Sequence, residues 1–400
     1  MSLFSLLDRH RTEPTSTKPP AAEADPERGP VVQQGRARDQ PVPPPQNAVR
    51  CTRQIFAWWT DQIGDVVDFW IERLPKVELH VHLEGSLRPA TLLTLAQRNG
   101  VDLGAGSPDE LAELYQFSNF ADFAKLFRSG LAALRTAADF ADATAALAAE
   151  LAAQNVRYAE VTTTPFNHIR RGVAPEEYRE GLDEGRRRAR DEHGVELGWI
   201  CDISRESEDP AAHSTVDFLL GRSAPAGVVG LGLGGVEDGY PADLFTSSFA
   251  KARANGLASL PHAGETAGAE SIWAALRSLH AERIGHGIRC LDDPALVDHL
   301  ADRGIPLEVA PSSNVGLKLC PSLAEHPLGE LARSGLAVTL NTDDPAYFRT
   351  TLNAELRAAH DLHGFTRQDL LDSQRTALSA SRAPAGTKAA ISRELAEVQP

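Results

Sequence analysis

The chain has 400 residues, of which 42% are apolar and 24% charged, and its formal net charge is −15. That charge excludes nucleic-acid binding through bulk electrostatics and is typical of a soluble enzyme of small molecules. The four cysteines lack CxxC spacing and no apolar run reaches membrane-span length, so we expect a cytoplasmic protein with reduced thiols and no membrane partner.

Two different segments precede the main domain. Residues 11–50 hold nine of the 26 prolines and many charges, so residues 1–50 are predicted to form a disordered leader. Over residues 51–74, apolar and tryptophan side chains recur at helical spacing. We expect an amphipathic helix that packs on the domain, with a partner-binding surface as the alternative.

From residue 75 onward, strand-length apolar runs alternate with helical patterns rich in Ala, Leu, Glu and Arg. The runs cover residues 77–81, 156–161, 195–200, 228–233, 257–260, 283–285, 305–309 and 336–340. Helical stretches such as 139–153, 175–193 and 293–303 lie between them. Eight such repeats predict an α/β fold over residues 75–400, a (β/α)8 TIM barrel.

A long insertion, residues 88–139, follows the first strand. It carries an apolar stripe at helical spacing, made of Phe117, Phe120, Phe123, Phe127 and Leu131. The stripe either packs on the barrel or closes over the substrate, and in the second case Phe123 and Phe127 would contact the substrate. After the eighth strand, Thr366–Asp369 predicts a capping box that opens the C-terminal helices.

Four motifs sit at or just beyond strand ends: His80-Val81-His82, His262-Ala-Gly-Glu265, His286 and Asp343-Asp344. Residues two apart on a strand point to the same side, and the carboxyl ends of barrel strands meet at one face. An HxH pair alone could be satisfied by hydrogen bonds. Together, however, three imidazoles and one carboxylate predict a single Zn2+ per chain, held by His80, His82, His262 and Asp343.

Three further groups remain for proton handling and substrate contact. His286 is expected to orient a zinc-activated water and take its proton, or else to be a fourth nitrogen ligand or a packed core residue. Glu265 is expected to protonate a substrate nitrogen, with a hydrogen bond that orients a metal-binding histidine as the alternative. Asp344 is expected to project onto the substrate.

The motifs together resemble those of the adenosine deaminase family of metal-dependent hydrolases. The similar segments are PKVELHVHLEGSL from residue 75, PHAGE from 261, IGHG from 284 and NTDDP from 341. The resemblance extends from about residue 75 to about 395 and implies a (β/α)8 barrel that replaces a purine 6-amino group by oxygen and releases ammonia. The fourth strand lacks a terminal lysine, which implies one metal rather than two.

The resemblance also implies a role for individual residues. Glu265 would donate to purine N1, His286 would help to generate the attacking hydroxide, and Asp344 would bond N7. The backbone N–H of Gly235 would meet N3, and Glu84 would face the ribose 5′ end.

The group on purine N9 is less well indicated. Glu84 stands where adenosine deaminases carry Asp and is similar to adenine and aminodeoxyfutalosine deaminases, whereas the Gly234-Gly235 pair is unlike the serine-bearing loop of the free-base branch. Adenosine is therefore expected first, a 5′-modified nucleoside such as aminodeoxyfutalosine second and adenine third. The rival classes are a non-deaminating amidohydrolase and a binding module without activity; a cytidine-type deaminase is excluded because no CxxC exists.

Overall fold

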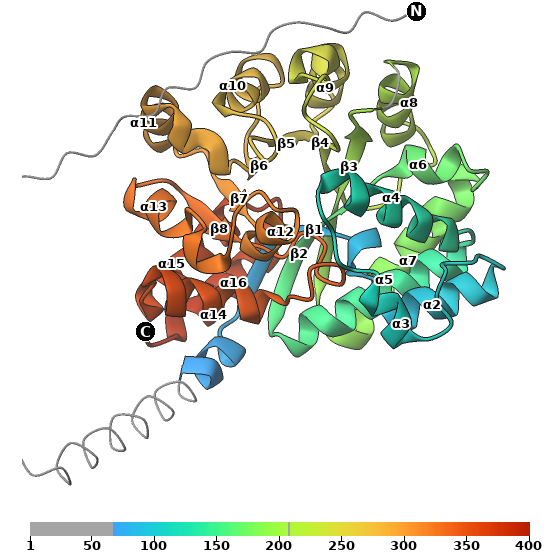
Figure 1. Cartoon of the computed structure of the whole chain (residues 1–400), viewed down its shortest axis with the longest axis horizontal. Helices are drawn as coiled ribbons and strands as arrows, with labels where there is room; N and C mark the ends of the chain where they lie inside the picture. The colour runs from blue at the N-terminus through green and yellow to red at the C-terminus, as the bar shows by residue number, and fades with distance from the viewer. Residues whose placement is uncertain (1–66, 207–208) are drawn as a thin grey trace, which may run out of the picture. The chain divides into compact units, whose positions relative to one another are not determined.

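The computed structural model describes residues 67–206 and 209–400 (Figure 1). The predicted leader over residues 1–50 lies outside these residues, as does most of the predicted helix over residues 51–74. The described end of that helix, residues 67–73, is helical and buries Val67 and Ile71 in the main core. The indole Nε1 of Trp70 donates to the carbonyl of Gln399 over 2.8 Å, which joins this segment to the C-terminal end.

Eight parallel strands form the centre of the fold and pair in sequence order from β1 to β8. They are β1 (Lys76–His82), β2 (Val156–Thr163), β3 (Glu196–Ser204), β4 (Val228–Gly234), β5 (Ala258–Ala263), β6 (Ile284–His286), β7 (Leu307–Val309) and β8 (Val338–Leu340). Each overlaps one of the predicted runs. The predicted (β/α)8 TIM barrel is therefore confirmed.

The first and last strands meet beyond the end of β8. Val81 and Asp343 form a parallel bridge. The His82 N–H donates to the Asp343 carbonyl over 2.8 Å, and the Asp343 N–H donates to the His80 carbonyl over 3.0 Å. Residues of two predicted motifs thus close the barrel with their own backbone.

Helices surround the strands (Figure 1). Within the described residues they are α2 (Pro89–Arg98), α3 (Pro108–Glu113), α4 (Phe120–Gly130), α5 (Ala137–Ala153), α6 (Pro165–Ile169), α7 (Pro175–His193), α8 (Asp209–Leu219), α9 (Thr246–Ala254), α10 (Ala269–Ser278), α11 (Pro294–Arg303), α12 (Pro311–Gly316), α13 (Leu328–Arg333), α14 (Leu352–His363), α15 (Arg367–Ala380) and α16 (Ala385–Glu397). The predicted insertion is helical and contains α2, α3 and α4. None of the described helices is both long and apolar enough to span a bilayer.

Local sequence signals explain several helix ends. The predicted capping box opens α15: Thr366 accepts from the Asp369 N–H while the Asp369 carboxylate accepts from the Thr366 N–H. The helix predicted over residues 293–303 begins at 294, because Asp293 is its N-cap. The left-handed Gly194 ends α7.

Candidate active site

A cavity of about 160 Å³ opens at the carboxyl ends of the strands. Its inner wall is formed by residues from β1, β3, β5, β6 and the turn after β8, and α4 and α6 contribute its outer wall. The predicted site residues that line it are His82, Phe123, Phe127, Gly235, His262, Glu265, His286, Asp343 and Asp344. This is the face on which TIM barrels carry their chemistry.

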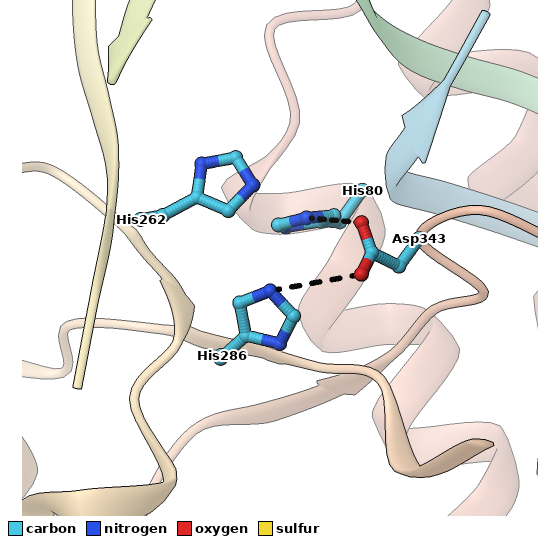
Figure 2. Close-up of side chains that lie close together, drawn as sticks. All are labelled: His80, His262, His286 and Asp343. Atoms are coloured by element: carbon cyan, nitrogen blue, oxygen red, sulfur yellow. Dashed lines mark ion pairs between the residues drawn. The ribbon is translucent and has the colours of Figure 1, made fainter. Parts of the chain in front are cut away.

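Four buried side chains at the floor of the cavity point toward one another: His80, His262, His286 and Asp343 (Figure 2). Their candidate ligand atoms all lie within 4.8 Å of one another. The fifth member of the group is His82, whose Nε2 lies 3.3 Å from the His262 Nε2 and 3.2 Å from the Asp343 Oδ1. The structure therefore brings the predicted ligand set together and adds His286 beside it.

Three of the separations among the predicted ligand atoms match those around a tetrahedral ion. With metal–ligand distances of about 2.0–2.1 Å, ligand atoms around such an ion lie roughly 3.3–3.4 Å apart. The His80 Nε2 is 3.3 Å from the Asp343 Oδ1, close to the two His82 distances. By contrast, the His286 Nε2 lies 3.8 Å from the other Asp343 oxygen, Oδ2. By these contacts His82 is the better fourth ligand, although His286 also lies within 4.8 Å of the other three.

Neighbouring groups leave the ligand atoms free to face the ion. The His80 Nδ1 lies 3.1 Å from the Glu308 Oε2, which directs the other ring nitrogen into the cluster. The His80 Nε2 is buried without a hydrogen-bond partner. The Ser313 hydroxyl donates to the Asp343 Oδ2 over 2.6 Å, so Oδ1 remains for the imidazoles. Such orientation of ligands by a second layer of groups is characteristic of metal sites.

Two residues of the group hold left-handed backbone conformations. The φ angle is 60° at His286 and 63° at Asp343, a region that costs non-glycine residues free energy. At Asp343 this conformation accompanies both the backbone bonds to β1 and a side chain aimed at the histidines. Strain of this kind concentrates at functional sites, where the surrounding structure stabilises it.

A chain of hydrogen bonds determines which nitrogen of His286 carries its proton. The Leu328 N–H donates to the His326 Nδ1 over 3.0 Å, so the His326 Nε2 must donate to the Asn314 Oδ1, 3.0 Å away. The Asn314 amide nitrogen then faces the His286 Nδ1 at 3.2 Å and donates to it. The neutral His286 ring therefore carries its proton on Nε2, the nitrogen that faces Glu265 and Asp343.

Two carboxyl groups in the cavity favour their protonated form. Burial, together with the nearby Asp343 and Glu237 carboxylates, raises the pKa of Glu265 well above its usual value. Burial and the neighbouring Asp343 carboxylate do the same for Asp344. A protonated carboxyl can donate a hydrogen bond, which a carboxylate cannot.

The side chain of Asp344, which follows β8, occupies space that is available only because residue 85, which follows β1, is glycine. A Cβ on Gly85 would lie 1.7 Å from the Asp344 Oδ1, so no other residue fits at position 85 without displacing this carboxyl. The same Oδ1 is buried without a partner. The glycine of the HLEGS segment is thus explained by its contact with the last motif.

Glu84 lies behind the cavity wall rather than on it. Its Oε1 accepts from the Thr163 hydroxyl over 2.6 Å and lies 2.9 Å from the His168 Nε2. These two hydrogen bonds and the charge of His168 outweigh the effect of burial and lower the pKa of Glu84. The expectation that Glu84 faces the substrate 5′ end stays a prediction.

Several residues of the site were not anticipated from the sequence. Asp202 of β3 lines the cavity, its Oδ2 lies 3.8 Å from the His262 Nδ1, and burial raises its pKa to about 7. A Cβ on Gly232 or Gly234 would lie within 2.5 Å of an Asp202 carboxylate oxygen, so the glycine-rich β4 makes room for it. The sequence signal for this residue is its position: Asp202 is an acidic residue within the mostly apolar end of β3.

The proteins that this chain resembles in sequence include several deaminases. A family model described as adenosine deaminase matches residues 75–398. An aminodeoxyfutalosine deaminase of Streptomyces avermitilis is 41% identical, with 84% of this chain and 94% of that protein aligned. An adenine deaminase of Geotalea uraniireducens is 40% identical, over 81% and 91% of the two chains.

Solved structures are similar as well. The adenine deaminase of Arthrobacter aurescens superposes with a TM-score of 0.78 at 36% identity, over 81% of this chain and 98% of that one. An amidohydrolase of Burkholderia ambifaria, solved with bound Zn, gives a TM-score of 0.75 at 28% identity, over 82% and 91%.

Proposed function

The chain belongs to the adenosine deaminase family. We propose that it deaminates the adenine ring of a 5′-modified nucleoside such as aminodeoxyfutalosine. It is a hydrolytic aminohydrolase of cyclic amidines, as its relatives are. In this reaction the purine C6–N bond breaks, a C6–O bond forms from water, and ammonia leaves.

The choice of substrate rests on one observation: the aminodeoxyfutalosine deaminase of S. avermitilis is 41% identical over 94% of its own length. The order expected from the sequence placed adenosine first, and the comparisons support the alternative better. Free adenine is the second candidate, because an adenine deaminase is 40% identical over 91% of its length.

The metal in this proposal is one Zn2+ held by His80, His82, His262 and Asp343. The donor set of three imidazole nitrogens and one carboxylate oxygen, with three of its separations at 3.2–3.3 Å, supports that assignment. A zinc ion there would supply Lewis acidity that lowers the pKa of water toward neutrality.

The side chains around the cavity would complete the reaction. Protonated Glu265 would donate to N1, which makes C6 electrophilic as negative charge develops on the ring. Protonated Asp344 would donate to N7, and the Gly235 N–H to N3.

His286 would act on the attacking oxygen. The sequence motif predicts that this residue takes a proton, but the hydrogen bonds through Asn314 and His326 place a proton on its Nε2 already. His286 would therefore first hold the oxygen by donating to it, and would accept a further proton only by becoming a cation.

One comparison of rates tests the proposal. Ammonia release would be measured on aminodeoxyfutalosine, adenosine, deoxyadenosine and adenine, with Glu265→Gln protein as a control for contaminating deaminases. We expect kcat/KM on aminodeoxyfutalosine to exceed the others by about tenfold or more, equivalent to about 1.4 kcal/mol in the transition state. A higher value on adenine would establish the second candidate, and cleavage of simple amides without adenine deamination would indicate the amidohydrolase class.

A further inference from the structure

The mouth of the cavity is basic, although the chain as a whole is acidic. Arg128 at the C-terminal end of α4 and Arg170 just after α6 both line the cavity and are exposed to solvent. Neither is within salt-bridge distance of a carboxylate in the described parts of the chain, whereas Arg88 and Arg188 elsewhere on the surface form such pairs. Two guanidinium groups at one opening are therefore left with their charges unneutralised.

A third arginine, Arg171, connects the two segments that carry them. The Arg171 Nη2 donates to the Arg128 carbonyl and its Nη1 donates to the Asn167 carbonyl, both over 3.2 Å. Arg171 thus joins the end of α4 to α6. Burial, followed by the nearby charges of Arg170 and Arg128, lowers the pKa of Arg171, so the three guanidinium groups repel one another weakly. An anion between them would offset that repulsion.

The inner part of the cavity offers no arginine or lysine. Its polar groups are imidazoles and the carboxyl groups of residues such as Asp202, Asp343 and Asp344. Among the described residues that line the cavity, Arg128 and Arg170 are the only arginines, so an anionic end of a ligand would pair with them at the opening while its ring reaches the floor.

The wall between floor and mouth is aromatic. Phe120, Phe123 and Phe127 of α4 line the cavity, with the Phe123 and Phe127 ring centroids 5.5 Å apart. Arg128 follows Phe127 directly in the sequence. A flat aryl group could lie against these rings with a carboxylate extending to the arginines.

From this arrangement we propose that Arg128 and Arg170 bind an anionic group carried by the substrate beyond its ribose. The inference rests on the proposed function and deepens it, because aminodeoxyfutalosine carries a benzoate at its 5′ side. A nucleoside 5′-phosphate presents the same kind of charge without the aryl group, and adenosine presents neither.

The test uses Arg128→Ala, Arg170→Ala and the double variant, with Arg170→Lys to retain charge. Arg375→Ala, an exposed arginine on α15, is the matched control. We expect each alanine variant to lose about 10- to 100-fold in kcat/KM on aminodeoxyfutalosine, mostly through KM, as for a lost charge-assisted hydrogen bond. Activity on adenosine should be unchanged, and the wild-type preference for the anionic substrate should weaken as salt rises. The Arg170→Lys protein should lose less than the alanine variant.

Binding measurements separate this inference from the proposed function. In a Glu265→Gln background, dissociation constants would be determined for aminodeoxyfutalosine, adenosine 5′-phosphate and adenosine. Selective loss of affinity for either anionic ligand in the arginine variants supports the anion site. If the affinity for the phosphate alone is affected, the proposed substrate is wrong while the site stands. Equal losses on adenosine, or no loss on either anion, would overturn the inference even if aminodeoxyfutalosine proved to be the substrate.

Discussion

The carboxylate of Glu237, beyond the end of β4, binds the backbone of Glu265, beyond the end of β5. Its Oε1 accepts the Glu265 N–H over 2.8 Å. The same side chain accepts from the N–H groups of Gly264 and Thr266 and from the Ser271 hydroxyl. One buried anion thus organises the turn that carries the proposed proton donor.

Glu237→Gln replaces one acceptor oxygen by an N–H donor that faces other donors. We expect kcat to fall about 10- to 100-fold, as for loss of a group that orients a catalytic residue, with a destabilisation of about 1–3 kcal/mol. Steady-state kinetics and thermal unfolding would measure both, with Glu180→Gln, an exposed residue of α7, as the control. A lower melting temperature with unchanged kcat would show that Glu237 only stabilises the fold.

Asp343→Ala removes the carboxylate that lies between His80 and His82. We expect zinc content to fall well below one per chain and turnover to be lost, because three neutral imidazoles bind the ion more weakly. Elemental analysis of the purified protein measures the first and ammonia release the second. Asp298→Ala, on the exposed side of α11, should retain both. Full zinc occupancy in the Asp343 variant would refute the ligand assignment.

Asn314→Asp tests the chain of hydrogen bonds to His286. A carboxylate can only accept, so His286 would move its proton to Nδ1 and present an acceptor to the cavity. We expect kcat to fall by about 10- to 100-fold and the pH–rate profile to change shape, while zinc content stays the same. Asn255→Asp, exposed at the end of α9, is the control. An unaltered pH profile would mean that the tautomer of His286 does not matter.

Gly85→Ala tests the contact between the first and last motifs. The new Cβ would occupy the place of the Asp344 Oδ1, so we expect kcat/KM to fall by at least about tenfold, roughly 1.4 kcal/mol in transition-state binding. Zinc should remain bound. Gly386→Ala in α16, where a Cβ meets nothing within 4 Å, should leave the rate unchanged and stabilise the fold by about 0.4–1 kcal/mol. Wild-type rates in the Gly85 variant would exclude Asp344 from substrate binding.

The burial of Lys76 predicts that the free energy of unfolding depends on pH. Its ammonium donates to the carbonyls of Leu74 and Gln154, and burial lowers its pKa from 10.5 to about 7. Between pH 7 and 10.5 the unfolded chain therefore binds a proton that the folded chain does not, so this group adds stability as the pH rises through that window.

Lys76→Met should remove that contribution. Urea unfolding at pH 6.5, 8 and 9.5 would measure it: the wild type should gain stability relative to the variant as the pH rises. Lys251→Met, an exposed lysine on α9, should show no such trend. A constant difference between wild type and variant at all three pH values would contradict the lowered pKa.

Much of the barrel could be predicted because its signals are local. The strands follow from apolar runs, and α7 coincides with the helix that its content of Ala, Leu, Glu and Arg predicts over residues 175–193. The metal cluster could be predicted because strand ends in a barrel share one face, which brings His80 and Asp343 together.

The remaining features depend on contacts between distant segments. Nothing near Glu237 indicates that it binds the turn after β5, and nothing near Asn314 indicates that it lies between His286 and His326. Arg128 and Arg170 stand among many other charged residues in the sequence. Their role becomes visible only when α4 and α6 lie beside the same cavity.

Because Asp343 both bridges to β1 and faces the histidines, the ion would act as a cross-link between the two ends of the domain sequence. During synthesis the nascent polypeptide would lack a complete cage until its last strand had left the ribosome. A product terminated before Asp343 would lack both the backbone bridge to β1 and the carboxylate of the ligand set.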